Sequence, residues 1–324
     1  MRVLVIEDST QLAGLVGREL EQELGCEVSC ARDPVEALAG HRDHEFDLAI
    51  VDLLYEHLNR DFEARRIAGT ISLTSASLLV TGLAAVHRLT VPRRDAGVVI
   101  WTSGEANRRL HLLFAYEDLA ARVFCSKSSG TGRADTLMEA LKAAADGRSY
   151  VDPVLNSYLP AEGQPAIRDT ILREASKRAV WRALAIGART RGQISEITGY
   201  SSRHVGNLIP AMFDDLARLD AGLAPSEAPM ADVISYASRN WEFFLDDTVR
   251  AMYPLHVTFS AADGNRDVQR VSIDMDLEAH AVPDAAAGRV RDGGTATTRI
   301  RKDDAGQVAE SMRHRNGDLA DRDV

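Results

Sequence analysis

Cysteine is scarce in this 324-residue sequence: Cys26, Cys30 and Cys125 are too few to form a disulfide framework. No Cys-x-x-Cys pair or histidine cluster has the spacing of a zinc site, so we expect small buried thiols in a reducing compartment. The N-terminus meets the acidic Glu7 before any long apolar run, which is not the pattern of a signal peptide. These absences predict a cytoplasmic protein.

Long hydrophobic runs are also lacking. Residues 67–86 carry no charge over twenty positions, which is long enough to cross a bilayer. Six of the twenty are serine or threonine and two are glycine, a composition that favours a soluble segment. The sequence therefore predicts no membrane association.

Positive charge is in deficit, since the formal net charge is −10. This gives no support for nucleic-acid binding by the chain as a whole, but the charge is unevenly distributed. Residues 165–220 carry a net charge of +3, whereas residues 1–130 carry −5. An acidic first part and a basic middle part suggest two different partners. The length and the 45% apolar fraction fit two globular domains and a tail.

Short apolar runs alternate with helical patterns through the first 150 residues. The runs of strand length are Val3–Ile6, Glu27–Ala31, Asp47–Asp52, Val98–Trp101 and Val123–Cys125. Ser9 or Thr10 can cap a helix that ends at Gly25, Asp33-Pro34 opens a second helix with proline at its first position, and helical spacing is strong over 134–145. Strand alternating with helix in this way predicts an α/β fold with a doubly wound five-stranded parallel sheet, flavodoxin-like in class.

Polar residues of complementary types follow these strands: Glu7 and Asp8 after the first, Asp52 after the third, Thr102 after the fourth and Lys127 after the fifth. In open α/β sheets the carboxyl ends of the strands gather the ligands. Three converging carboxylates repel one another unless a hard cation such as Mg²⁺ lies among them. The hydroxyl and the ammonium supply a donor and a cation for a phosphoryl group. Because a carboxylate can itself be the nucleophile, the set predicts a Mg²⁺-assisted phosphoryl acceptor.

Residues 1–155 resemble the receiver domain of two-component response regulators. In this resemblance Glu7 and Asp8 match the acidic Mg²⁺-binding pair, Asp52 the phospho-acceptor, Thr102 the switch hydroxyl, Lys127 the phosphate-contacting lysine and Phe124 the aromatic switch position. The segment 147–153, GRSYVDP, looks like the end of receivers of the NarL/FixJ branch. The resemblance implies that a sensor histidine kinase phosphorylates Asp52. Thr102 and Phe124 would then change the face formed by the fourth helix, fifth strand and fifth helix.

Three features depart from the receiver pattern. Residues 53–80 hold an insertion of roughly twenty residues where a strand–helix loop usually has about 2–6. The insertion, which carries Arg60, Arg65 and Arg66, either covers the acceptor or forms a solvated surface excursion. Ser128 stands where receivers usually have proline, and bulky Trp101 precedes Thr102, which we interpret as core packing.

A second domain, predicted over 167–222, follows an exposed linker over 156–166 that contains Pro160, Gly163 and Pro165. We expect three helices: Asp169–Ile186, Arg191–Thr198, and one that Ser201 or Ser202 caps and that runs to Leu216. Two short helices joined at Gly199 indicate a helix-turn-helix, although a generic three-helix bundle would give a similar pattern.

The segment 193–209, QISEITGYSSRHVGNLI, resembles the LuxR-type helix-turn-helix that follows receivers of this branch. The resemblance implies DNA binding. Arg203, His204 and Asn207 are candidates for the major groove, and Arg189 and Arg191 for phosphates. Gly206 stands where the family often has a basic residue, and Pro210 should kink or shorten the recognition helix.

The C-terminal region is less patterned. Over 223–282 we expect a helix, Ala231–Tyr253, and a hairpin around the turn Asp263-Gly264-Asn265. From 283 to 324 small and charged residues dominate, which predicts disorder.

The sequence thus favours a phosphorylation-controlled transcription regulator and not an enzyme. The expected partners are a sensor histidine kinase and DNA, and we expect the protein to form a homodimer. One alternative is a phosphorylation-independent receiver-like regulator controlled by a ligand or protein partner. Another is a phosphatase of the haloacid-dehalogenase type, which needs an aspartate two residues after the nucleophile. That position holds Leu54, which argues against hydrolysis.

Overall fold

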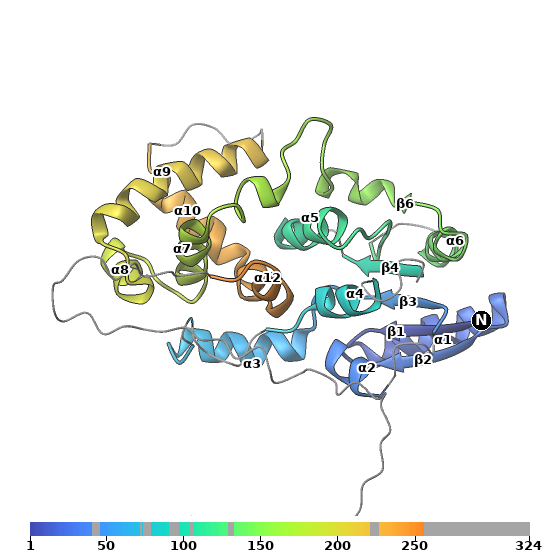
Figure 1. Ribbon diagram of the computed structural model, residues 1–324. Helices are drawn as coiled ribbons and strands as arrows, with labels where there is room; N and C mark the ends of the chain where they lie inside the picture. Colours follow the sequence, from blue (N-terminus) through green and yellow to red (C-terminus); the bar gives the residue numbers. More distant parts are fainter. Residues whose placement is uncertain are drawn as a thin grey trace, which may run out of the picture. The chain divides into compact units, whose positions relative to one another are not determined.

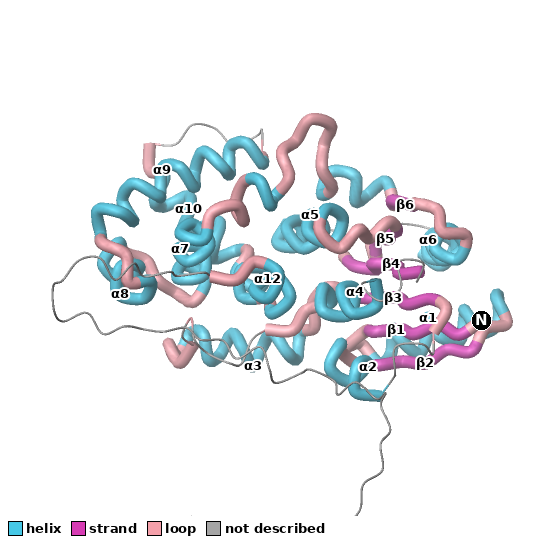
Figure 2. The backbone as a smooth tube through the Cα atoms, viewed as in Figure 1, coloured by secondary structure: helices cyan, strands magenta, loops and turns pink. Residues whose placement is uncertain are grey.

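The computed structural model describes residues 1–40, 46–71, 73, 79–90, 97–103, 106–128, 133–220 and 227–255, and within them six parallel strands form one sheet (Figure 2). Their order is β2-β1-β3-β4-β5-β6. The strands are β1 (Arg2–Ile6), β2 (Glu27–Ala31), β3 (Leu48–Val51), β4 (Gly97–Thr102), β5 (Val123–Ser126) and β6 (Tyr150–Val151). The parallel sheet is confirmed, but the prediction of five strands is wrong. The sixth has only two residues, paired with Val123 and Phe124, and is too short to show a sequence period.

The inner strands β1, β3, β4 and β5 are buried on both faces, which explains why they are nearly continuous apolar runs. Val3 and Val5 face the helices α1 (Thr10–Leu24) and α6 (Arg133–Ala145). Leu4 and Ile6 face the other layer. That layer contains α2 (Pro34–Gly40), α4 (Gly82–Thr90) and α5 (Arg109–Glu117), the last preceded by the short helix η1 (Ala106–Arg108) (Figure 1).

Local signals set the first helix boundaries. Ser9, one of the two predicted caps, accepts a hydrogen bond from the amide of Leu12 and begins α1. Gly25 ends that helix with φ of 58°, a conformation that glycine adopts without strain. The Asp33 carboxylate accepts from the amide of Glu36 and begins α2, with proline at the first helical position as expected.

The region predicted as an insertion contains an extra helix, α3 (Glu56–Ile67), directly after β3. The next helix, α4, packs on β3 and β4 and makes the crossover between them. It begins at Gly82, which follows Thr81 and the region 53–80 that the sequence predicts to hold the insertion. The helix α3 is therefore additional to the doubly wound arrangement.

After the sheet the described chain is helical. Its elements are η2 (Pro153–Tyr158), η3 (Ile167–Asp169), α7 (Ala175–Ala185), α8 (Arg191–Thr198), α9 (Ser202–Leu219), α10 (Pro229–Arg239), α11 (Trp241–Leu245) and α12 (Asp247–Met252). The predicted start of the first long helix at Asp169 is wrong, because residues up to Asp169 form a separate 3₁₀ turn. Pro210 does not shorten α9, which continues for nine further residues. Among the described helices none is long and apolar enough to span a bilayer.

The single C-terminal helix predicted over Ala231–Tyr253 is three short ones. The break before α12 has a local cause: the Asp246 side chain accepts from the amide of Val249, so it caps a new helix instead of continuing the old one. The predicted hairpin around Asp263 and the predicted disorder over 283–324 lie outside the described residues.

Candidate functional site

Three carboxylates meet at the carboxyl edge of the sheet. Glu7 and Asp8 follow β1 and Asp52 follows β3, which are neighbouring strands, and one oxygen of each lies within 4.8 Å of the others. Glu7 and Asp52 are almost fully buried, with 3% and 4% of their surface exposed. Burial raises the pKa of Glu7, and the nearby Asp52 charge adds to that effect. Three oxygen donors so close together fit a hard divalent cation such as Mg²⁺.

Lys127 joins two of these carboxylates. Its Nζ donates to Glu7 Oε2 and to Asp52 Oδ2, each at 2.5 Å. The lysine is held without the proline common in receivers, since its amide donates to the Thr102 carbonyl and the Ser128 amide donates to the Ser126 hydroxyl. Its ammonium also lies 5.1 Å from the ring centroid of buried Trp101. The cation therefore has a fixed position beside the acceptor candidate.

A second cation, which the sequence did not indicate, approaches the same aspartate. Arg108 lies at the end of η1, with Nη1 3.6 Å from Asp52 Oδ1 and 3.2 Å from the fully buried Thr102 Oγ1, to which it donates. Residue spacing cannot reveal such a contact, because Arg108 belongs to the turn after β4 and not to a strand end. The guanidinium of Arg108 therefore contacts both Thr102 and Asp52.

Phe124, the predicted switch aromatic, is fully buried in β5. Its ring lies 6.1 Å from that of Tyr116 on α5. The structure thus places Phe124 between the sheet and α5 and not in the carboxylate cluster.

The first residue of the extra helix α3, Glu56, contacts the cluster of carboxylates formed by Glu7, Asp8 and Asp52. The amide of Glu56 donates to Asp8 Oδ2 at 2.6 Å, so the positive end of the helix dipole points toward that carboxylate. His57 contacts Asp33 Oδ2 through Nε2 at 2.9 Å. Of the arginines noted in the insertion, Arg60 pairs with Glu56 on the surface, while Arg66 lies over the Trp241 ring. The first turn of α3 therefore forms part of the wall of the site.

These groups surround a cavity of about 340 Å³. Its lining includes Asp52, Lys127 and Arg108 from the sheet side, and Glu242 of α11 from the C-terminal helices. Burial raises the pKa of Glu242 to about 7. The sequence offered no sign of this contribution, because Glu242 stands within the apolar run WEFFL.

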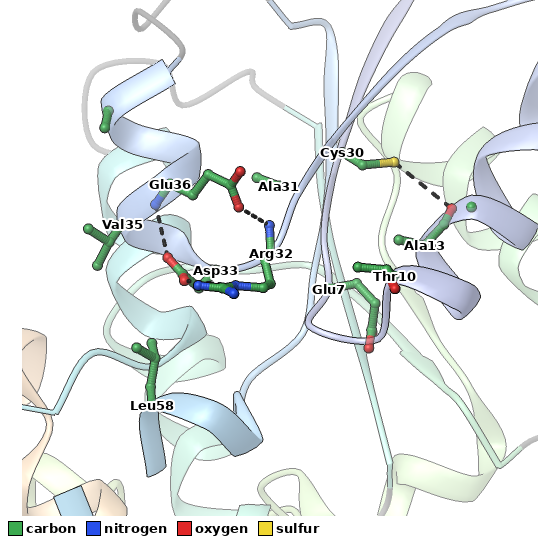
Figure 3. Close-up of a pocket in the computed structure, with 12 residues that line it drawn as sticks. Glu7, Thr10, Ala13, Cys30, Ala31, Arg32, Asp33, Val35, Glu36 and Leu58 are labelled. Carbon is green, nitrogen blue, oxygen red and sulfur yellow. Dashed lines mark hydrogen bonds and ion pairs between the residues drawn. The ribbon is translucent and has the colours of Figure 1, made fainter. Parts of the chain in front are cut away.

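A second and larger cavity shares Glu7 with the first. It has a volume of about 800 Å³ and lies between α1, β2 and α2, with Leu58 of α3 at one side (Figure 3). Its charged groups are satisfied locally: Glu36 accepts from the amide of Arg32, and Asp33 accepts from the amide of Glu36. Burial opposes ionisation of Asp33, but the hydrogen bonds from Glu36 and His57 prevail and lower its pKa.

The helices α8 and α9 meet at Gly199, which has φ of 73°. Val205, Leu208 and Ile209 of α9 are buried, whereas Arg203, His204 and Asn207 are exposed on the opposite side of the helix. Ser201 caps α9 as predicted, and Thr190 with Gln193 forms a capping box that begins α8. The Thr-x-x-Gln spacing of that box is itself a sequence signal for this helix start.

Two arginines predicted to meet phosphates have different surroundings. The guanidinium of Arg191, which belongs to α8, lies 3.5 Å from where a β-carbon at Gly206 of α9 would be. A basic group therefore lies beside α9 at residue 206, although that residue is glycine. Arg189 donates through Nη1 to the carbonyls of Leu184 and Ala188 at the end of α7.

No family model matches the sequence, and no curated protein matches it. Among solved structures, a CheY-like receiver domain protein from Methanospirillum hungatei is 20% identical over 45% of this chain and 94% of that chain, with a TM-score of 0.33. The response regulator TrrA from Thermotoga maritima in complex with Mg²⁺-BeF is 24% identical over 44% and 97%, with a TM-score of 0.32. The response regulator RcsB in its DNA complex is 15% identical over 73% and 98%, with a TM-score of 0.44.

Proposed function

We propose that the chain is a cytoplasmic, homodimeric transcription regulator controlled by phosphorylation, in which Asp52 accepts a phosphoryl group from a sensor histidine kinase. The observation that carries this proposal is the position of the Asp52 carboxylate. It lies within 4.8 Å of the Glu7 and Asp8 carboxylates and contacts Lys127 at 2.5 Å, at the carboxyl edge of a parallel sheet. A buried carboxylate nucleophile with two further carboxylates and two cations, Lys127 and Arg108, beside it suits phosphoryl transfer.

Each residue has a distinct part in the proposed reaction. An oxygen of Asp52 attacks phosphorus as the bond from phosphorus to the kinase histidine nitrogen breaks, and the released imidazole takes up a proton. Glu7, Asp8 and Asp52 would hold Mg²⁺, which would neutralise part of the negative charge as the Asp52 carboxylate approaches the phosphoryl group. Lys127 and Arg108 balance the added charge of the phosphoryl oxygens, and Thr102 can donate a hydrogen bond to one of them. The residue two after Asp52 is buried Leu54, so we propose no phosphatase activity.

A second candidate is a phosphorylation-independent regulator, and one observation favours it: the site is partly closed. The Glu56 amide already bonds to Asp8, and Glu242 lines the cavity. The two candidates differ in the expected effect of Asp52→Asn. Under our proposal acetyl phosphate with Mg²⁺ changes the DNA affinity and the oligomeric state of the wild type, and the variant does not respond. Identical behaviour of both proteins, with and without the phosphodonor, would favour the second candidate.

The proposed DNA surface is the exposed side of α9, supported by Arg203, His204 and Asn207 near the helix start. We expect Arg203→Ala to weaken binding to DNA selected from a random library by about 1–3 kcal/mol. Arg218→Ala is the matched control, because Arg218 is exposed on the same helix near its other end and pairs with Asp215. Fluorescence anisotropy titrations at several salt concentrations measure both effects. Equal affinities for wild type and Arg203→Ala would place the DNA surface elsewhere.

A further inference from the structure

The helix α11 inserts a carboxylate into the cavity that contains Asp52. Glu242 is 8% exposed and lines that cavity together with Arg108 and Lys127. Its Oε2 is buried and has no hydrogen-bond partner in the described part of the chain. A buried carboxylate oxygen without a donor is unfavourable, so its position needs a cause.

That cause is the packing of the residues on either side of Glu242. The Trp241 ring stacks on Phe62 of α3 at 5.7 Å, and the Arg66 guanidinium lies 4.9 Å from the Trp241 centroid. On the following residue, the Phe243 ring lies 5.9 Å edge-on from Phe114 of α5. These aromatic contacts hold α11 against α3 on one side and against α5, which packs on the sheet, on the other. They therefore fix the position of Glu242.

The next part of the chain connects α11 to the loop before α4. Asp246 is fully buried and accepts from Thr81 through its amide at 3.2 Å and its hydroxyl at 2.8 Å. The amide of Gly82 in turn donates to the carbonyl of Leu53, the residue after Asp52. On its other side α11 packs on α7, where Phe244 stacks on Trp181 at 5.0 Å. Because α7 in turn packs on α8 and α9, a displacement of α11 would be transmitted through α7 to these two helices.

A phosphoryl group on Asp52 cannot share this cavity with an ionised Glu242 without strong repulsion. The positive charges that act on Glu242 come from Arg108 and Arg66. Arg108 is 3.6 Å from Asp52, so a phosphoryl group there would compete for the same guanidinium. The carboxylate would then remain buried beside added negative charge, which favours its departure from the cavity.

We propose that Glu242 is a positioning residue of the phosphorylation site: it opposes phosphoryl transfer to Asp52, and the transfer drives Glu242 and α11 out of the cavity. This inference rests on the proposed function of Asp52. It adds a route by which phosphorylation of Asp52 would affect α7, α8 and α9. The extra helix α3 then has a defined part, because Phe62 and Arg66 retain α11 until the phosphoryl group arrives.

The test compares Glu242→Gln with the wild type in the full chain. Glutamine preserves the shape and removes the charge, so Asp52 should form its adduct with acetyl phosphate and Mg²⁺ about tenfold faster, as expected for loss of a like-charge interaction. Asp247→Asn is the control, because it removes a carboxylate from the same segment at an exposed position. Intact mass spectrometry over time gives the rates.

A second measurement reports the movement. Hydrogen exchange of peptides from 241–252 should increase when wild-type protein binds beryllium fluoride with Mg²⁺, and Asp52→Asn should show no increase. Equal adduct rates in the wild type and Glu242→Gln, or unchanged exchange in a protein that does form the adduct, would overturn this inference and leave the proposed function intact. Slower adduct loss in Glu242→Gln with unchanged formation would make Glu242 a base instead and would also overturn it. No adduct on either protein would overturn both.

Discussion

Replacing Lys127 by alanine is expected to lower the free energy of unfolding by about 3–5 kcal/mol in Mg²⁺-free buffer, the usual effect of removing one partner from a buried ion pair. The lysine side chain is 15% exposed and contacts both Glu7 and Asp52, whose side chains are 3% and 6% exposed. Without the ammonium, these two carboxylates and Asp8 would lie together with less positive charge between them. One of them would have to take up a proton or attract another cation.

Magnesium distinguishes this electrostatic cause from a loss of packing. A divalent ion held by the three carboxylates should stabilise Lys127→Ala more than the wild type, because the variant lacks the competing ammonium. Urea unfolding with and without Mg²⁺ measures both quantities, and Lys142→Ala, which removes an exposed lysine of α6, is the control. A loss below about 1 kcal/mol would mean an ion pair no stronger than a surface one. Equal Mg²⁺ effects in both proteins would argue against a metal site at these carboxylates.

Replacing Gly82 by alanine is expected to destabilise the protein by about 3 kcal/mol, the upper end of the usual range for overpacking. A β-carbon at residue 82 would lie 1.9 Å from the Asp52 carbonyl oxygen and 2.9 Å from the Leu53 α-carbon. Both neighbours are backbone atoms at the end of β3, so they cannot rotate away as a side chain can. Relief of the clash requires either α4 or the peptide after the acceptor to move.

Gly14→Ala is the matched control and should change stability in the opposite direction. Gly14 lies inside α1, and a β-carbon added there would meet nothing within 4 Å, so alanine should stabilise the helix by roughly 0.4–1 kcal/mol. Thermal or urea unfolding measures the two variants, and the adduct rate with acetyl phosphate reports whether Asp52 has moved. A neutral Gly82→Ala variant with an unchanged adduct rate would show that the end of β3 tolerates displacement.

The sheet and its carboxyl edge could be predicted because their signals are local. Each buried strand is a short apolar run, and Asp52, Thr102 and Lys127 directly follow or end such runs. Parallel topology then brings strand ends together without further information. The strand β6 was missed because two residues carry no periodic signal.

The remaining parts of the site depend on contacts between segments far apart in the chain. Arg108 reaches Asp52 from an irregular turn, and Glu242 reaches the same cavity from 190 residues beyond Asp52 in sequence order. The apolar run around Glu242 predicts that this segment is buried, but the run does not indicate which other segments it packs against. The length of residues 53–80 revealed an insertion, but its docking on Asp8 and Trp241 could not be read from it.

The most direct measurement is the intact mass of the purified full chain after incubation with acetyl phosphate and Mg²⁺, beside Asp52→Asn and a wild-type sample with excess EDTA. We expect a phosphoryl adduct on the wild type that is absent from the variant and from the EDTA sample. Loss of the adduct in hydroxylamine would mark it as an acyl phosphate. A wild type that stays unmodified, or an equal adduct on Asp52→Asn, would contradict phosphoryl transfer to Asp52.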